Sequence, residues 1–90
     1  MTAAQINRRV RQEGLTFSSY CVLSNVSVTP ETVGSLRKLM RTSQPTITKM
    51  VQRLENLGLV RCERERVGKL RTEIFITGSG LELLGRIEPQ

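Results

Sequence analysis

The sequence contains no histidine and no tryptophan, and it has only two cysteines, Cys21 and Cys62. We expect no zinc site, because zinc ligands in proteins come mainly from sets of cysteine and histidine side chains. The lack of histidine also removes the most common general base of enzymes. No glycine-rich phosphate loop, serine-nucleophile motif or pair of carboxylates takes its place. We therefore expect a protein that is not an enzyme and that needs no metal or cofactor.

Aromatic residues and long apolar runs are also scarce. Aromatics make up 3% of the 90 residues, so a core must consist mainly of Leu, Val, Ile and Met. No segment approaches the length of a membrane span, and residues 1–14 lack the apolar region of a secretory signal. Two widely spaced cysteines without such a signal favour free thiols in a reducing compartment. We expect a soluble cytoplasmic protein with no membrane contact.

Positive charge is what the sequence has in excess. Fourteen Lys and Arg outnumber eight Asp and Glu, which gives a formal net charge of +6. This balance suits a polyanionic partner, because basic side chains that neutralise phosphates release condensed counterions. The length allows one small domain with a single modest core, and no repeat or linker divides it.

Apolar residues recur at helical spacing in five segments. The pattern predicts helices over residues 3–12, 15–28, 30–40, 43–57 and 80–88. Thr16 or Ser18 is the expected cap of the second helix. Near its end, Val26 and Val28 predict a brief extended segment. The residues of this helix expected to face the core are Phe17, Tyr20, Cys21 and Leu23.

The third helix is predicted to begin at residues 29–31. Thr29 would cap it, Pro30 would take the first helical position, and Glu31 would face the positive end of the helix dipole. A two-residue link, 41–42, then leads to the next helix. The two helices form a helix-turn-helix without the glycine that its turn often contains. The expected buried side of the third helix is Val33, Leu36, Leu39 and Met40.

The fourth helix has the strongest local signals. Ser43 is placed to cap it, Pro45 lies in its first turn, and Gly58 ends it. A short basic amphipathic helix of this kind can lie in the major groove of DNA, so we expect double-stranded DNA as the partner. The apolar stripe is Ile47, Met50, Val51, Leu54 and Leu57, and the opposite polar face is Lys49, Gln52, Arg53 and Asn56.

After Gly58 the apolar period changes from helical to alternating. Segments 59–65 and 70–77 flank a turn that contains Gly68, which predicts a charged antiparallel β-hairpin with Cys62 facing the core. A helix-turn-helix followed by a basic hairpin is a winged helix. The predicted fold class is therefore mostly α with a small antiparallel β-hairpin, a winged helix-turn-helix. It would form one domain over residues 1–90, with a core at about 15–88 and a short basic helix within 1–14.

The string SQPTITKMVQRLENLGLVRCERE, followed by a hairpin ending in Ile-Thr and a short helix, resembles the winged-helix domain of MarR-type transcription regulators. The resemblance covers about residues 15–87 and is densest over 43–65. It implies a sequence-specific DNA-binding transcription regulator, and a repressor. The helix at about 43–57 would read bases in the major groove, and the basic wing at about 64–71 would contact the backbone or minor groove. The DNA-binding residues that the resemblance implies are Ser43, Gln44, Pro45, Thr46, Thr48, Lys49, Arg53, Arg66, Lys69 and Arg71.

The sequence departs from the family pattern in two places. The family wing usually has Asp-Arg-Arg before its second strand, whereas this chain has Gly68-Lys69-Leu70, so Lys69 would take the basic role with Arg66 or Arg71 as substitutes. Family members also dimerise through long helices at both ends, and no long C-terminal helix precedes the end at Gln90. A homodimer would therefore use shorter equivalents. Its expected contact residues are Ile6, Val10, Leu81, Leu84 and Ile87.

Two smaller features have a structural interpretation. Some regulators of this type sense oxidants through a cysteine near the N-terminus, but Cys21 has no basic neighbour in sequence to lower its pKa. We interpret it as a small buried hydrophobic residue. The N-terminal arginines, Arg8, Arg9 and Arg11, form a basic cluster that fits a solvated chain end as well as it fits a phosphate contact.

Two other functions stay open on sequence alone. The winged helix could be a protein-interaction module acting on polymerase or another host protein, or a replication or partition initiator on repeated DNA sites. Salt-dependent binding to a palindromic site separates a regulator from an interaction module. Direct repeats at an origin would favour the initiator. The sequence identifies no small-molecule ligand.

Overall fold

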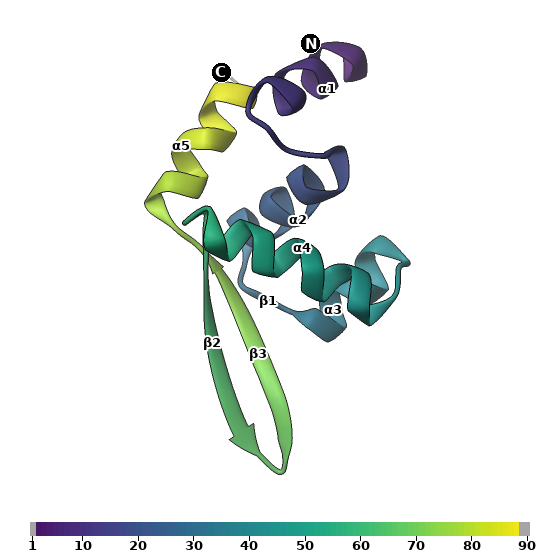
Figure 1. The fold of residues 1–90 in the computed structure, drawn as a ribbon, viewed down its shortest axis with the longest axis vertical. Helices are drawn as coiled ribbons and strands as arrows, with labels where there is room; N and C mark the ends of the chain where they lie inside the picture. Colours follow the sequence, from purple (N-terminus) through teal and green to yellow (C-terminus); the bar gives the residue numbers. More distant parts are fainter. Residues whose placement is uncertain (1, 89–90) are drawn as a thin grey trace.

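A computed structural model describes residues 2–88 of the chain, and of residues 66, 67, 69 and 70 it describes the backbone alone. Helices form the body of the molecule, and a long hairpin projects from one end of it (Figure 1). The predicted fold class, a mostly α winged helix-turn-helix, is confirmed. In chain order the elements are α1 (Ala3–Gln12), α2 (Phe17–Val28), β1 (Glu31–Thr32), α3 (Val33–Met40), α4 (Gln44–Asn56), β2 (Val60–Val67), β3 (Lys69–Ile76) and α5 (Gly78–Ile87).

Local capping sets where these five helices begin. Each is preceded by a threonine or serine whose side-chain oxygen accepts a hydrogen bond from a backbone N–H of the first turn. The turns after α1 and α4 use Gly14 and Gly58, whose φ angles of 79° and 75° favour glycine. The predicted bounds of α1 and α4 therefore agree with the structure to within a residue or two. The caps are Thr2, Thr16, Thr32, Ser43 and Thr77.

The expected start of the third helix at Thr29 is wrong. Thr29 instead ends α2 in an extended conformation, and α3 begins after Thr32. Thr32 and Ser35 close a reciprocal capping box, with Ser35 N–H donating to Thr32 Oγ1 at 3.1 Å and Thr32 N–H to Ser35 Oγ at 2.9 Å. Two capping bonds outweigh the single bond that Thr29 could offer.

The residues between α2 and α3 form a third strand that the sequence did not predict. Glu31 pairs with Ile74 and Thr32 with Glu73, so the antiparallel sheet has the order β1-β3-β2. A strand of two residues has no alternating pattern to detect. It anchors the root of the hairpin to the helix-turn-helix.

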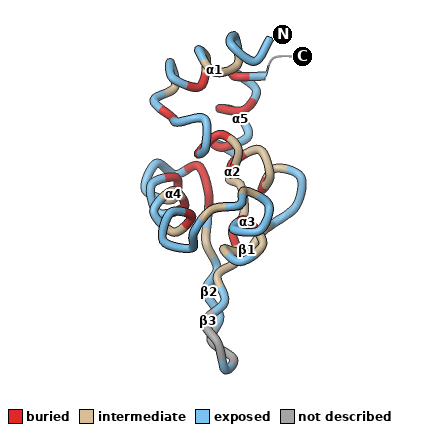
Figure 2. Tube along the Cα trace, turned by 90° about the vertical axis from the view of Figure 1, so that its right-hand side faces the viewer, coloured by how far each residue is buried: buried red, intermediate tan, exposed pale blue. Residues whose placement is uncertain are grey.

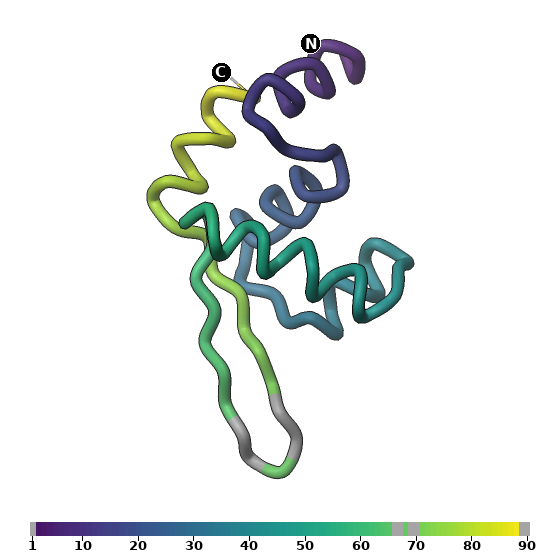
Figure 3. Tube along the Cα trace, in the orientation of Figure 1, coloured from purple at the N-terminus to yellow at the C-terminus, as the bar shows by residue number. Residues whose placement is uncertain are grey.

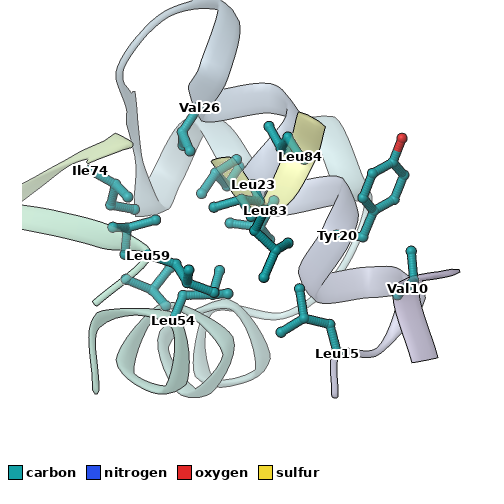
Figure 4. Packing of buried hydrophobic residues seen from close by; sticks show 14 of the residues in the cluster. Val10, Leu15, Tyr20, Leu23, Val26, Leu54, Leu59, Ile74, Leu83 and Leu84 are labelled. Carbon is teal, nitrogen blue, oxygen red and sulfur yellow. The ribbon is translucent and has the colours of Figure 1, made fainter. Parts of the chain in front are cut away.

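The core lies where α2, α4, α5 and the root of the sheet converge. Figure 4 shows Leu23, Leu54, Leu59 and Leu83 pointing toward one another from these elements. Burial of their apolar surface is the main favourable term in folding this domain. The buried apolar residues are Val10, Leu15, Tyr20, Val22, Leu23, Val26, Leu36, Ile47, Val51, Leu54, Leu59, Val60, Ile74, Leu83, Leu84 and Ile87.

Phe17 and Leu39, which the sequence predicts to face the core, are exposed, and Val28 is exposed as well. In α2, Phe17 and Val28 lie opposite the centre of the buried stripe at about 3.6 residues per turn, and Val22 and Val26 are buried instead. The extended segment predicted at Val26 and Val28 is also wrong, because both belong to α2. The large apolar residues at the surface, with their exposed fractions, are Phe17 (50%), Val28 (85%), Leu39 (58%), Leu57 (53%) and Leu81 (53%).

Among the residues whose side chains the structure describes, the buried ones lie in the body and at the root of the hairpin. Figure 2 shows buried residues in the helices and at the base of the sheet, with exposed residues along the outer part of β2 and β3. Both ends of the described chain lie at the opposite end of the molecule, beside α1 and α5 (Figure 3). Within residues 2–88, no helix combines the length and the apolar character needed to traverse a lipid bilayer.

Candidate nucleic-acid interface

The turn between α3 and α4 leads into a helix that packs against α2, α3 and β2. Arg41 adopts the left-handed conformation there, with φ 51° and ψ 48°, and no other non-glycine residue in the described part of the chain has a positive φ. The glycine missing from the predicted turn is thus replaced by a strained arginine. The backbone N–H of Arg41 still donates to the carbonyl oxygen of Arg37, and this hydrogen bond caps the C-terminal end of α3.

The first turn of α4 is held by its cap. Ser43 Oγ accepts from Thr46 N–H at 3.4 Å and lies 2.8 Å from Thr46 Oγ1. Pro45, whose missing N–H costs nothing in the first turn, is exposed together with Gln44 and Thr46. Small polar side chains at an exposed helix start can approach the edges of bases closely.

The remainder of α4 separates an inner from an outer face. Ile47, Val51 and Leu54 are buried, whereas Lys49 is exposed and Thr48 is half-buried. Four of the five residues of the predicted stripe therefore pack in or against the core, and Leu57 does not. Leu57 is the C-cap of α4, where the helical repeat has ended, and its side chain is therefore not on the buried face.

Arg53 lies on the flank of α4 that faces the turn between α1 and α2. Its Nη2 donates to the carbonyl oxygen of Gly14 at 3.3 Å, and the side chain is exposed. The guanidinium has five N–H donors, so this bond leaves others for a phosphate. The structure thus connects one of the predicted DNA contacts to the α1–α2 turn.

The wing presents two faces of different charge. The register pairs Glu63 with Glu73 and Glu65 with Arg71 on one face. Further toward the root of this face, Arg61 pairs with Glu63, and its guanidinium carbon lies 4.5 Å from the centre of the Phe75 ring. This face is therefore mixed in charge, and one of its arginines is already engaged.

The opposite face of the wing is turned toward α4. Alternation from the buried Val60 places Cys62 and Arg64 on this side of β2, and Thr72 lies opposite Arg64 on β3. Of the predicted wing contacts, Arg71 is exposed. The side chains of Arg66 and Lys69 lie outside the described residues.

A groove runs between α4 and the wing. It brings two predicted base-reading residues, Gln44 and Thr48, together with the predicted wing contact Arg71, which borders the groove although its register position is on the mixed face. It also contains two polar groups that the sequence did not single out as groove residues, Gln52 and Arg64. The full lining consists of Thr32, Val33, Gly34, Gln44, Thr48, Val51, Gln52, Arg64, Arg71 and Thr72.

An ion pair joins α4 to the wing, and its arginine, Arg64, is one of the residues that line this groove. Arg64 Nη2 lies 3.1 Å from Glu55 Oε1, and Nη1 lies 3.5 Å from Oε2. The hydrogen bond from Arg64 is the largest cause that lowers the pKa of the Glu55 carboxyl, and the same bond raises the pKa of Arg64. Strand alternation could have placed Arg64 on the inner face of the wing, but no sequence signal named its partner.

The two cysteines are free thiols, each half-buried. Burial is the largest cause that raises the pKa of both thiols, and the nearby Glu55 carboxylate raises that of Cys62 further. Both side chains pack against the core, as expected for Cys62 and for Cys21. In the described part of the chain, no group of three Cys, Asp or Glu side chains is arranged to hold a metal ion.

Most of the expected dimer contacts are used within the chain. Val10, Leu84 and Ile87 are buried in its own core, and Ile6 packs partly against it, so only Leu81 of the five residues is exposed. The cause is that α1 packs against α2 and α5 of the same chain. Arg86 Nη2 and Glu13 Oε1, 3.1 Å apart, add an ion pair to this packing.

Comparisons with known proteins agree with this fold. The disulfide form of AbfR is 30% identical, with a TM-score of 0.80, and the match covers 94% of this chain and 63% of that one. BldR, a transcriptional regulator from Sulfolobus solfataricus, is 29% identical, with a TM-score of 0.74 and coverages of 92% and 61%. AbsC, a MarR family transcriptional regulator from Streptomyces coelicolor, is 25% identical, with a TM-score of 0.82 and coverages of 96% and 60%.

The chain thus spans less than two thirds of the length of these solved structures. No curated protein sequence matches it significantly. A sequence model of the MarR family matches residues 13–69, which is more than half of the chain and includes α2, the helix-turn-helix and β2. The chain belongs to the MarR family.

Proposed function

We propose that this chain binds double-stranded DNA in a sequence-specific way and regulates transcription, without enzymatic activity. The observation that supports this best is the exposed first half of α4, which opens onto the same groove as the wing. An exposed polar helix beside a basic hairpin matches the two DNA-contacting parts of a winged helix. Overoxidized AbfR, also 30% identical to this chain, has been crystallised bound to DNA.

In the proposed complex, α4 lies in the major groove with its N-terminal half against the bases. Gln44, Thr46 and Lys49 would read base edges, and Arg53 would contact a phosphate from the flank of the helix. Lys49 is suited to guanine, whose O6 and N7 are acceptors in the major groove. The wing would contact the backbone or the adjacent minor groove through Arg71 and through Arg66 or Lys69.

We also propose that the chain acts as a homodimer and as a repressor. One helix of the length of α4 reads only a half-site, and two copies related by a two-fold axis would read a palindrome. The outer surfaces of α1 and α5, including the exposed Leu81, are the remaining candidates for contact between copies. The bound dimer would then prevent RNA polymerase from binding the same DNA. A structure of the assembly should place the two α4 helices about 34 Å apart.

The test begins with selection of a duplex from a randomised DNA pool by the wild-type chain. Affinity for the selected duplex and for an unrelated one is then measured over a range of salt concentrations. The proposal expects a steep salt dependence and a preference for the selected duplex. Lys49→Ala should weaken binding of the selected duplex by about 1–3 kcal/mol and reduce the preference at one base pair.

Glu82→Gln is a suitable control, because Glu82 is exposed on α5, away from the groove. It should leave the preference between duplexes unchanged. If the wild type enriches no duplex, or if Lys49→Ala binds the selected duplex as tightly as the wild type, α4 is not the reading helix and the proposal fails.

A further inference from the structure

The contact between Glu55 and Arg64 connects the two parts of the proposed DNA interface. Glu55 lies in the last turn of α4, and Arg64 lies midway along β2. Both terminal nitrogens of the guanidinium face the two carboxylate oxygens, at 3.1 and 3.5 Å. A two-point contact of this geometry fixes orientation as well as distance.

Neither residue can be explained as a core residue. The Arg64 side chain is 51% exposed and that of Glu55 33%, so the pair lies at the surface and adds little stability by itself. Two N–H donors of the guanidinium point to Glu55, and three remain. Arg64 also lines the groove that contains Gln44 and Thr48. A cation held in that place has donors free for a ligand in the groove.

Glu55 is unusual in a DNA-binding surface, because a carboxylate repels phosphates. Its charge offsets that of Arg64, so by charge alone the pair contributes nothing to the binding of a polyanion. Its position becomes useful if it directs the guanidinium. The pair also joins the inner face of the wing to the last turn of α4, so it restrains the angle between the hairpin and that helix.

We propose that Arg64 is a further contact to a DNA backbone phosphate, and that Glu55 is a positioning residue that orients Arg64 and holds the wing at a set angle to α4. This rests on the proposed function, since it concerns how the same surface binds DNA. The sequence predicts a basic wing at about residues 64–71 without naming Arg64 as an individual contact. This inference gives Arg64 a specific role, and it gives an acidic side chain a positive role in binding an acidic ligand.

Whether Glu55→Gln strengthens or weakens DNA binding separates a positioning role of Glu55 from a purely electrostatic one. If Glu55 acts only through its charge, Glu55→Gln removes a repulsive group and strengthens DNA binding. If Glu55 positions Arg64, the same substitution loosens the guanidinium and weakens binding. Glu55→Asp supplies a second, charge-matched variant, because it keeps the carboxylate and shortens its reach.

The experiment measures the affinity of the full chain for the duplex selected by the wild type and for an unrelated duplex. The variants are Arg64→Ala, Glu55→Gln, Glu55→Asp and the double variant Glu55→Gln/Arg64→Ala. The matched control is Glu65→Gln, which removes a carboxylate from the opposite face of the same hairpin. The thermal midpoint of each variant shows that it is folded.

Arg64→Ala should lower affinity about fivefold for both duplexes at about 0.15 M salt and reduce the salt slope by about 0.9, as expected for one lost phosphate contact. Glu55→Gln and Glu55→Asp should each lower affinity about twofold or more, whereas Glu65→Gln should leave it unchanged or raise it. The double variant should bind at least as tightly as Arg64→Ala alone, because Glu55 acts through Arg64 and its unpaired carboxylate only repels phosphates.

Tighter binding by Glu55→Gln overturns the positioning role, and so does a double variant whose losses simply add. Wild-type affinity in Arg64→Ala overturns the phosphate contact. These results are distinct from a failure of the proposed function itself. In that case the wild type selects no duplex and Lys49→Ala has no effect, whereas failure of this inference alone leaves both of those results intact.

Discussion

The α-carbon of Gly80 lies so close to the chain before β2 that a Cβ built on it would come 2.3 Å from the carbonyl oxygen of Leu59. The same Cβ would lie 2.7 Å from Cγ1 of Ile76, at the end of β3. Thr77, the cap of α5, adds a hydrogen bond from its hydroxyl to the carbonyl of Gly58 at 2.6 Å. The close approach of α5 to the root of the wing therefore requires glycine at position 80.

Gly80→Ala should destabilise the fold by about 1–3 kcal/mol, because the new methyl group meets a backbone oxygen that cannot move aside without shifting the strand. Urea unfolding monitored by circular dichroism gives the free energy of unfolding. Gly85→Ala in the same helix is the control, since a methyl group at that position would meet nothing within 4 Å. It should be neutral or stabilise by up to about 1 kcal/mol. Equal stability of the two variants would contradict the close packing.

Thr32→Ala should lower the free energy of unfolding by about 1 kcal/mol, because it removes one half of the capping box of α3. Thr29→Ala, at the position where the sequence places the cap, should change it by less than about 0.5 kcal/mol. Thermal or urea unfolding of both variants measures the difference. If Thr29→Ala lowered the free energy of unfolding more than Thr32→Ala does, Thr29 would be the cap of α3, as predicted from the sequence.

Arg53→Ala should weaken DNA binding to a similar extent for every duplex, by about fivefold at about 0.15 M salt, and flatten the salt slope by about 0.9. The reason is that a phosphate contact carries no sequence information. Arg86→Ala removes the same charge at the far end of the molecule, where Arg86 pairs with Glu13, and should change affinity much less. A loss confined to the selected duplex would instead indicate that Arg53 reads a base.

The ion pair between Glu55 and Arg64 should make a small pH-dependent contribution to stability. The folded state lowers the pKa of Glu55 below its ordinary value of 4.5, so the unfolded state binds the proton more tightly. The contribution is therefore complete above about pH 4.5 and is lost as the pH falls through the folded-state pKa. The stability difference between wild type and Glu55→Gln, measured by urea unfolding from pH 7 downward, should shrink in that acid range. A difference that grows on acidification would contradict the lowered pKa.

Much of the architecture could be predicted from short-range signals. Ser43, Pro45 and Gly58 determine the bounds of α4 through bonds and dihedral preferences within one or two turns. The alternation around Gly68 likewise predicts the hairpin, whose strands pair over their whole length in the structure. These signals are local, because each depends on residues that are neighbours in sequence.

The errors occur where two local signals compete or where an element is too short to have a pattern. Thr29-Pro30 is a good helix start by itself, but Thr32 and Ser35 make a better one three residues later. Helical spacing also leaves the direction of the apolar stripe open near helix ends, which is why Phe17 and Leu39 are expected on a buried face and lie at the surface. Which side of a helix becomes buried depends on the elements that pack against it.

Capping, turn formation and periodicity act over a few residues, and for that reason the amino-acid sequence alone specifies a winged helix with a capped, basic fourth helix and a charged hairpin. Packing in three dimensions decides that α1 and α5 bury their apolar residues against the same core, and that β1 ties the wing to α3. It also decides which cations face the groove and which are engaged elsewhere. Those properties depend on contacts such as Glu55 with Arg64, which form only when the packed core brings a helix and a strand together.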